Sequence, residues 1–417
     1  MYLAKLFFIL PLMLQQADAP LDKVANQIVK QINDQSQHIA RIYHPGLLKQ
    51  VSEAQLLALY KDFATKHGRI VGIHAKKRTV PESGQFTLTF EKGVEMQMTL
   101  TIDRQTPPRV VSIWFSPPVS SFKDIASIIK EIKKLPGRVN FEIARLDDKL
   151  TVTHTLHADQ ALAIGSTFKL YLLGTIVAKK RPWDDVVKLE DRYKSLPSGI
   201  LQTWPDGSPV TLHTLATEMI SISDNTAADH VLYTLGRETV ESQMAKIGNS
   251  NPERSWPMLS TLEMFKIKSN AALIKQYTQS NIDERRRLLD GRIGQMSRAG
   301  LAPFSEGKPI AIEKVEWFAS ADDLCRAMNW FHQKKDETAL SILAINPGAT
   351  SMRSEFDYIG YKGGSEPGVL NFTWLLRTKK GTHFALSMGW NNPAKEGVDL
   401  EKFLGLGRSA LRILASR

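Results

Sequence analysis

Regular alternation of apolar and polar residues predicts a β-hairpin in the N-terminal part of the chain. Apolar side chains stand at every second position over residues 86–90 and again over residues 94–102. A period of two is that of a strand with one buried face, and the Lys92-Gly93 pair between the two runs is a turn signal. One more strand is predicted over residues 110–115, because the apolar run there ends at Pro117-Pro118.

A helix is predicted ahead of these strands, over residues 53–66. Gly68 follows it, and a glycine just beyond the last turn is a common helix stop. A helix followed by an antiparallel sheet resembles the small α+β cone of the nuclear-transport-factor-2 or cystatin-like type. We therefore expect residues 20–118 to form one α+β domain. It contains no acidic pair or His-Asp pair suited to catalysis, which favours a binding or docking role.

The remaining residues, 122–417, alternate between helical and strand patterns and predict a second, larger domain. Its first helix carries isoleucines at positions 125, 128, 129 and 132, the i, i+3, i+4, i+7 spacing of one apolar helix face. Four strand patterns follow, two soon after this helix and two near the C-terminus: residues 139–143, 150–156, 369–377 and 383–390. A last amphipathic helix is predicted by the apolar positions between 403 and 414.

The first 19 residues have the features of an export signal. Lys5 precedes an apolar stretch over residues 6–14, and Ala17-Asp18-Ala19 resembles the small-residue site at which signal peptides are cut. The stretch is too short to span a bilayer as a helix, and no later segment is apolar enough to do so. We therefore predict a signal peptide over residues 1–19, with an uncleaved anchor as the alternative, and an exported protein, periplasmic or secreted, with no integral membrane segment.

Composition narrows the classes of partner. The net charge of +11 favours anionic surfaces such as cell-wall polymers or lipid headgroups. Nucleic acid is the competing interpretation, but the chain has no zinc-finger spacing and no dense basic run with interleaved aromatic residues. Phosphate-loop, dinucleotide and metal-ligand motifs are also absent, so we expect neither a cofactor nor a metal. The single cysteine, Cys325, excludes an intrachain disulfide and is interpreted as a small buried residue.

A serine and a lysine three residues apart, Ser166 and Lys169, are candidates for a nucleophile and its base. The pattern S-x-x-K occurs four times in the chain, but only this copy leads into a continuous apolar segment, residues 170–173. The spacing places both side chains on one helix face, one turn apart. A buried helix has little reason to hold a lysine that lacks a partner or a function. A helix-capping serine and a lysine that reaches solvent are the alternative interpretation.

Two further short strings follow in order along the chain. Ser223-Asp224-Asn225 occurs once and lies between two helix-like segments, where Asp224 could also act as a helix cap. Lys362-Gly363-Gly364-Ser365 opens a stretch that leads into a predicted strand, and alone it could equally be a surface turn. No string is specific by itself, but the order, spacing and context of the three make their combination informative.

In combination, S-x-x-K, S-D-N and K-x-G resemble the motifs of active-site-serine penicillin-recognising enzymes, and of class A β-lactamases in particular. The resemblance covers residues 122–417 and implies an α/β (α+β) fold: a five-stranded antiparallel sheet with helices on both sides. It implies that Ser166 attacks a carbonyl, that Lys169 is its base and that Ser223 protonates the leaving group. Four more residues are implied to bind substrate, namely Asn225, Lys362, Gly364 and Ser365.

Two departures separate this chain from the class A pattern. Gly363 stands where the family has threonine or serine, so one hydroxyl contact to a substrate carboxylate is missing. The E-x-x-x-N loop that carries the deacylating glutamate is absent between Asn225 and Lys362. Glu263 is the only stand-in there, although a surface position on a helix is expected for it, and residues 270–312 resemble an insertion. With the cone-like domain in front, the arrangement is similar to two-domain β-lactamase-like proteins of a clavulanic acid gene cluster.

Three functions follow from the sequence as alternatives. The first is a serine hydrolase that forms an acyl-enzyme with β-lactams, or with esters and amides of similar shape, and deacylates slowly. The second is a D-alanyl-D-alanine peptidase acting on peptidoglycan. The third is a non-enzymatic protein that is acylated by penicillin and senses or binds the cell wall. The sequence leaves the natural substrate and the oligomeric state open.

Overall fold

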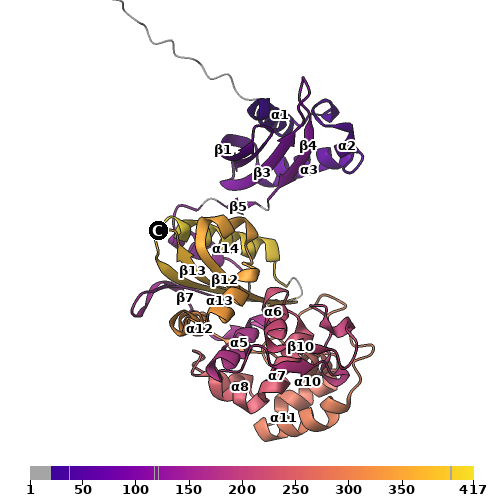
Figure 1. Ribbon diagram of the computed structural model, residues 1–417, viewed down its shortest axis with the longest axis vertical. Helices are drawn as coiled ribbons and strands as arrows, with labels where there is room; N and C mark the ends of the chain where they lie inside the picture. Colours follow the sequence, from indigo (N-terminus) through magenta and orange to yellow (C-terminus); the bar gives the residue numbers. More distant parts are fainter. Residues whose placement is uncertain (1–19, 37, 117, 121, 395–396) are drawn as a thin grey trace, which may run out of the picture. The chain divides into compact units, whose positions relative to one another are not determined.

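The computed structural model describes residues 20–36, 38–116, 118–120, 122–394 and 397–417. The predicted signal peptide, residues 1–19, lies outside this part of the chain. The chain divides between Ser121 and Phe122 into two compact units, which can be followed in Figure 1. Within the described ranges, no helix combines the length and the apolar character that a membrane crossing requires.

The N-terminal unit packs helices against one antiparallel sheet. Strands β1 to β4 lie side by side in chain order, and β5 pairs with the start of β3. The sheet consists of β1 (Ile70–Val80), β2 (Ser83–Phe90), β3 (Val94–Ile102), β4 (Val110–Phe115) and β5 (Val119–Ser120). The helices are α1 (Pro20–Asn33), α2 (Pro45–Leu48) and α3 (Glu53–His67).

The predicted hairpin and helix of this unit are both present. Helix α3 begins at a capping box made by Ser52 and Gln55 and ends at Gly68, which has φ +79°. Strands β2 and β3 form the hairpin, and the residues of the apolar positions are buried, except for the half-buried Val94 at the start of β3. Helix α1 was not predicted, although it has a regular apolar face; its buried side chains are Leu21, Val24, Ala25, Ile28 and Ile32.

The second unit is built on a five-stranded sheet. The strand order is β12-β13-β14-β6-β7, and every neighbouring pair is antiparallel. The strands are β6 (Arg138–Leu146), β7 (Leu150–Leu156), β12 (Phe356–Glu366), β13 (Val369–Thr378) and β14 (His383–Asn391). The four strands predicted from alternation correspond to β6, β7, β13 and β14.

Helices cover both faces of this sheet. Successive residues of a strand point to opposite faces, and in β13 Trp374 packs with the first and last helices of the unit while Leu375 joins the core beneath the other helices. The first and last helices are α4 (Ile125–Ile132) and α14 (Leu400–Ala415), and α12 (Ala321–Lys334) lies on the opposite face. The predicted architecture of one antiparallel sheet between two helical layers is therefore confirmed. Cys325, on α12, is buried as predicted.

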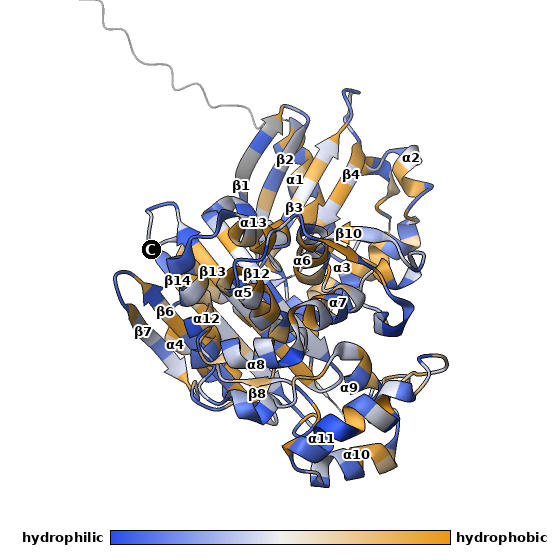
Figure 2. Cartoon of the chain, turned by 60° about the horizontal axis from the view of Figure 1, so that its bottom comes forward, coloured by the Kyte–Doolittle hydropathy of each residue, from blue (hydrophilic) through white to orange (hydrophobic). Residues whose placement is uncertain are grey.

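The segment between β7 and β12 is mainly helical. Its helices are α5 (Lys169–Ala178), α6 (Leu212–Ser221), α7 (Asn225–Leu235), α8 (Arg237–Met244), α9 (Thr261–Lys268), α10 (Ala271–Gln279), α11 (Ile282–Leu288), α12 and α13 (Glu337–Ile345). Two small two-stranded sheets join them, formed by β8 (Leu162–Ala163) with β11 (Phe318–Ala319), and by β9 (Val186–Lys188) with β10 (Pro209–Thr211). The inserted residues supply α10 and α11, and α11 is largely hydrophilic in Figure 2.

The position of the K-x-G string differs from the prediction. Lys362-Gly363-Gly364 was expected to precede a strand, but it lies inside β12, which begins at Phe356. Three glycines between positions 360 and 364 interrupt the apolar alternation, and glycine has a low strand propensity. From Gly360 onward this strand therefore has no readable pattern in the sequence.

Candidate active site

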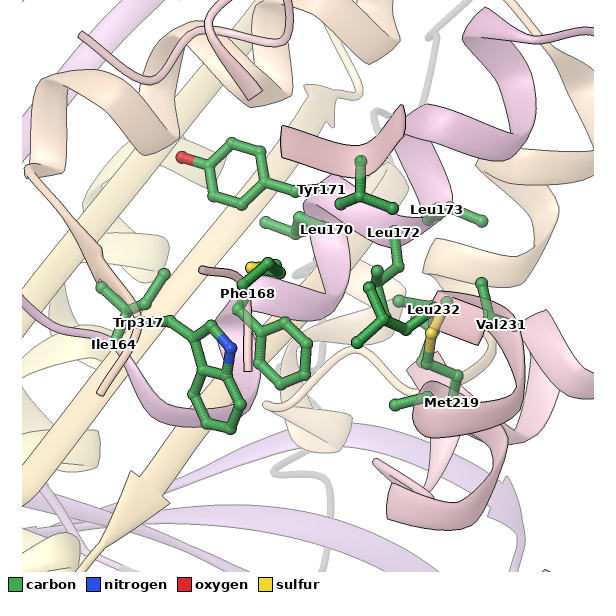
Figure 3. Close-up of a cluster of buried hydrophobic side chains, with 14 of the residues drawn as sticks. Ile164, Phe168, Leu170, Tyr171, Leu172, Leu173, Met219, Val231, Leu232 and Trp317 are labelled. Atoms are coloured by element: carbon green, nitrogen blue, oxygen red, sulfur yellow. The ribbon is translucent and has the colours of Figure 1, made fainter. Parts of the chain in front are cut away.

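Ser166 lies in a single 3-10 turn, Gly165–Phe168, immediately before helix α5. The sequence predicted that Ser166 would open the helix itself, but α5 begins at Lys169. Tight 3-10 turns are frequent at helix entries, and Gly165, with φ +48°, permits this one. The ring of Phe168 stacks on Trp317 with centroids 3.9 Å apart, which anchors the turn to the core (Figure 3).

Lys169 is completely buried and is held by hydrogen bonds to the S-D-N string. Its Nζ donates to the Ser223 carbonyl oxygen at 2.5 Å, to Asn225 Oδ1 at 2.8 Å and to Ser223 Oγ at 3.2 Å. Burial lowers the pKa of Lys169 to about 7, against the opposing effect of the charges on Asp229 and Asp224. A lysine with this pKa is partly neutral near pH 7 and can accept a proton.

The Ser223-Asp224-Asn225 string forms the turn between α6 and α7. Asp224 caps α7, and its carboxylate accepts from the Ala227 N–H at 2.8 Å, so the helix cap considered from the sequence is present. The same carboxylate also accepts from the backbone N–H groups of Ile200 at 2.6 Å and Leu201 at 2.9 Å. These bonds fix a turn in which Ser223 has φ +61°, a conformation that is uncommon for serine. The Asp224 cap of α7 therefore also fixes the position of Ser223, the catalytic candidate.

Lys362, in β12, contacts the same hydroxyl as Lys169. Its Nζ donates to Ser223 Oγ at 3.0 Å and to the Gly363 carbonyl oxygen at 2.6 Å. Burial, together with the charge of Lys169, lowers the pKa of Lys362. Because Ser223 Oγ accepts from two lysines, its own proton can be donated elsewhere, which suits a group that protonates a leaving atom.

The turn that carries Ser166 packs directly on β12 at Gly364. A Cβ built on Gly364 would lie 1.9 Å from the Ile164 carbonyl oxygen and 2.7 Å from the Ser166 nitrogen, so only glycine fits. A Cβ built on Gly165 would lie 3.0 Å from the Ser365 nitrogen. The backbone N–H groups of Ser166 and Ser365 therefore come from two segments in close contact, and such a pair can hold an oxyanion.

A cavity of about 600 Å³ lies over these residues. It is lined by six of the seven residues predicted from the sequence: Ser166, Ser223, Asn225, Lys362, Gly364 and Ser365. Lys169, the seventh, is not in the lining and contacts the cavity residues Ser223 and Asn225. Asn225 also donates through Nδ2 to the Leu196 carbonyl oxygen at 3.0 Å, so its orientation is fixed at both ends. Concave sites with a few fixed polar groups are typical for small-molecule binding.

Glu263 does not belong to this cavity, and its predicted surface position is wrong. The side chain is buried because it completes a capping box at the start of α9, where it accepts from the Ser260 N–H at 2.7 Å. It also pairs with Arg237 at 2.7 Å. Every residue of α9 is buried, which its mixture of charged and apolar residues did not predict. Glu263 therefore stabilises a helix end and is not placed to activate water in the cavity.

The sequence analysis missed a buried charge cluster in the cavity wall. Lys268 Nζ contacts Glu316 Oε1 at 2.9 Å and Glu366 Oε1 at 2.5 Å, and both glutamates line the cavity. Within the described part of the chain, Glu366 Oε2 is buried and has no hydrogen-bond partner. Burial and the neighbouring Glu316 raise the pKa of Glu366, since one lysine faces two carboxylates. The three residues lie far apart in the sequence, and no motif links them.

Replacing Lys268 by methionine is expected to lower the free energy of unfolding by about 3–5 kcal/mol. This is the usual cost of removing one partner of a buried ion pair, because the other charge stays buried without compensation. The loss should be smaller at pH 5 than at pH 8. A carboxylate whose pKa is raised in the folded state contributes stability below its unfolded pKa and loses it as the pH rises. Urea unfolding at both pH values measures the effect. The matched control is Lys308→Met, because Lys308 pairs with Glu306 in the solvent; equal losses in the two variants would contradict a structural role of the cluster.

Comparison with known proteins identifies the family of this chain. Residues 121–405, more than half of the chain, match the model of the β-lactamase enzyme family. Among solved structures, the β-lactamase from Sphaerobacter thermophilus is 21% identical (TM-score 0.49), and the match covers 70% of this chain and 97% of that one. The β-lactamase from Francisella tularensis is 16% identical (TM-score 0.49), and the match covers 70% of this chain and 98% of that one. PBP-A is 17% identical (TM-score 0.48), and the match covers 70% of this chain and 95% of that one. Comparison with curated proteins gives no match. On the strength of the family model, this chain belongs to the β-lactamase enzyme family.

Proposed function

We propose that this chain is an active-site-serine hydrolase, similar to class A enzymes, that is acylated on Ser166 by β-lactams or by esters and amides of similar shape. One observation carries the proposal. The amine of Lys169, buried and with a pKa of about 7, bonds to Ser223 and Asn225, which line one cavity with Ser166. Burying an amine costs free energy that its hydrogen bonds offset only in part, and groups with perturbed pKa values gather at catalytic sites.

The proposed acylation assigns one role to each of these groups. Neutral Lys169 takes the hydroxyl proton of Ser166 while Ser166 Oγ forms a bond to the substrate carbonyl carbon. The N–H groups of Ser166 and Ser365 hold the oxyanion. When the carbonyl re-forms and the bond to the leaving atom breaks, Ser223 donates its proton to that atom and regains a proton from Lys169. The products are an ester on Ser166 and a protonated leaving group.

We propose that hydrolysis of this ester is slow. Among the described residues that line the cavity, the carboxylates are Glu316 and Glu366, and both bond Lys268. Glu263, the candidate from the sequence, is committed to Arg237. A positioned general base typically contributes ~10²- to 10⁴-fold to such a step. Because each of these carboxylates is held in an ion pair, none is assigned to activate water, and the acyl-enzyme should accumulate.

The test is incubation with a chromogenic cephalosporin. We expect a burst of about one product per active site followed by a slow steady state, the kinetic sign of an accumulating acyl-enzyme. Intact mass recorded within the first seconds and again after minutes should show the same adduct. Rapid turnover without an adduct would contradict slow deacylation, and Glu366→Gln would then test the charge cluster as the base. If neither adduct nor product forms, the proposed function is wrong.

A D-alanyl-D-alanine peptidase is the second candidate, and the net charge of +11 favours an anionic polymer such as peptidoglycan as partner. Release of D-alanine from a peptide ending in D-alanyl-D-alanine would identify this activity. An acylated sensor or wall-binding protein would release none and would keep the penicillin adduct. The same two measurements therefore separate all three alternatives.

We also propose export to the periplasm or secretion, with residues 1–19 as the signal peptide. The charged start, the apolar stretch and the Ala17-Asp18-Ala19 site support it. The N-terminal unit is proposed to be a docking module of the cone type, since its α+β sheet carries no catalytic set. Fractionation of producing cells, with the mass of the mature chain, tests the export signal.

A further inference from the structure

The place where the K-x-G string lacks a hydroxyl is filled by the hydroxyl of another residue. Tyr361 and Gly363 are two positions apart in β12, so their side-chain positions lie on the same side of the strand. A Cβ built on Gly363 would lie 2.0 Å from Tyr361 Oη. The Tyr361 phenol therefore bends along the strand and occupies the space that a side chain at position 363 would take.

The ring is fixed in this position by its neighbours. It covers Gly348, where a Cβ would lie 2.5 Å from the ring atoms. Its centroid lies 5.2 Å from that of Trp374 and 6.5 Å from that of Phe372. Two glycines and two aromatic rings thus define one place for the phenol, and Tyr361 lines the cavity there with Gly348 and Gly363.

The hydroxyl at the end of the ring is available to a ligand. Within the described part of the chain Tyr361 Oη makes no hydrogen bond, whereas Tyr358 on the same strand donates to the Leu340 carbonyl oxygen at 2.8 Å. Tyr361 is half-buried and lines the cavity, so a ligand there can reach its hydroxyl. Burial raises the pKa of Tyr361, so the hydroxyl stays protonated and can donate.

The ligand group that suits this donor is an anion. Lys362 Nζ donates to the Gly363 carbonyl oxygen at 2.6 Å, so the amine and the phenol both lie against the same glycine. Burial and Lys169 lower the pKa of Lys362, and an anion beside it would favour its charged form. Hydrogen bonds to an ionised partner are about twice as strong as those between neutral groups.

We propose that Tyr361 is a specificity-determining residue: its hydroxyl donates to the carboxylate of the acyl donor, alongside Lys362, in place of the hydroxyl that Gly363 lacks. The inference rests on the proposed function, because it concerns the substrate of the same cavity. It predicts a preference for substrates that carry a carboxylate over uncharged esters of the same shape, a preference that the K-G-G string does not indicate.

The test compares acylation by benzylpenicillin with acylation by its methyl ester, which lacks the negative charge. Tyr361→Phe removes the hydroxyl and keeps the ring. The ratio of the two second-order acylation rate constants, acid over ester, is expected to fall about 10- to 100-fold, the range for losing a hydrogen bond to a charged group. Tyr358→Phe removes a hydroxyl from the same strand outside the cavity and should leave the ratio unchanged.

A second set of variants tests the placement of the hydroxyl. Gly363→Thr alone collides with the phenol and should impair acylation. Tyr361→Ser removes the ring and should lower the ratio, and the double variant Tyr361→Ser/Gly363→Thr should recover it. Such non-additivity is the sign of two groups that compete for one place.

The outcomes separate this inference from the proposed function. An unchanged ratio in Tyr361→Phe would overturn the inference, and so would equal losses with the acid and the ester, which would indicate a packing role. If the parent protein is not acylated on Ser166 at all, the proposed function fails. If the parent protein is acylated on Ser166 but Tyr361→Phe does not change the ratio, the inference fails and the proposed function stands.

Discussion

Replacing Ser166 by alanine is expected to abolish covalent labelling by a fluorescent penicillin, because the acyl bond forms on its Oγ. In a serine protease of the subtilisin type, loss of the nucleophile alone costs on the order of 10⁶-fold in turnover. The cavity and its other polar groups should persist, since the Ser166 side chain carries none of the hydrogen bonds that hold Lys169, Ser223 and Asn225 together. In-gel fluorescence and intact mass after incubation with the penicillin measure the effect.

A matched control for this variant is Ser305→Ala. Ser305 begins another S-x-x-K string, ending at Lys308, but it is exposed. Its substitution should leave the labelling rate unchanged. Labelling that survives in Ser166→Ala would show that a different serine is the nucleophile, with Ser223 the first to examine because it contacts both lysines.

The sheet and its covering helices could be predicted where burial imposes a regular period. Strands β6, β7, β13 and β14 and helices α4 and α14 each have one buried face or a continuous apolar run, and all were predicted. The same holds for α3 in the N-terminal unit. Strand β12 was not predicted over its full length, because its glycines at positions 360, 363 and 364 remove the alternation. Two of these glycines are needed by the candidate site. Gly364 allows the Ser166 turn to contact the strand, and Gly363 leaves room for the Tyr361 ring.

The candidate site could be predicted for the residues that belong to the three short strings S-x-x-K, S-D-N and K-x-G. Each of the three strings brings its own residues, and the structure places their side chains or backbone around one cavity or, for Lys169, in contact with its lining. The roles of these residues stay predictions. The expectation that Ser166 opens α5 was wrong by one turn, because a 3-10 turn precedes the helix.

Contacts between distant segments could not be predicted. Lys268 meets Glu316 and Glu366 only because α9, the segment that leads into β11 and the end of β12 converge in the fold. Tyr361 reads as an ordinary strand residue until the space above Gly363 is known. The burial of Glu263 could not be predicted either. Its capping role and its ion pair with Arg237, 26 residues away, do not alter the pattern of its own helix.

Replacing Lys169 by methionine is expected to slow acylation by about 10²- to 10⁴-fold, the usual contribution of a positioned general base. The pH profile of the parent protein gives an independent sign of the same role. Lys169 acts as a base only when neutral, and its pKa is lowered to about 7. The acylation rate should therefore rise with pH, by about tenfold per unit below pH 7, and level off above it.

Methionine also removes three hydrogen bonds from Ser223 and Asn225, so a slower rate alone would not separate a base from a positioning residue. The pH profile does, because the residual acylation of Lys169→Met should lose the inflection near pH 7. Lys179→Met, which changes an exposed lysine at the end of α5, should keep both the rate and the inflection. If the inflection persists in Lys169→Met, another group titrates in this range. Lys362 would then be the first candidate, since it is the second lysine on the Ser223 hydroxyl and its pKa is also lowered.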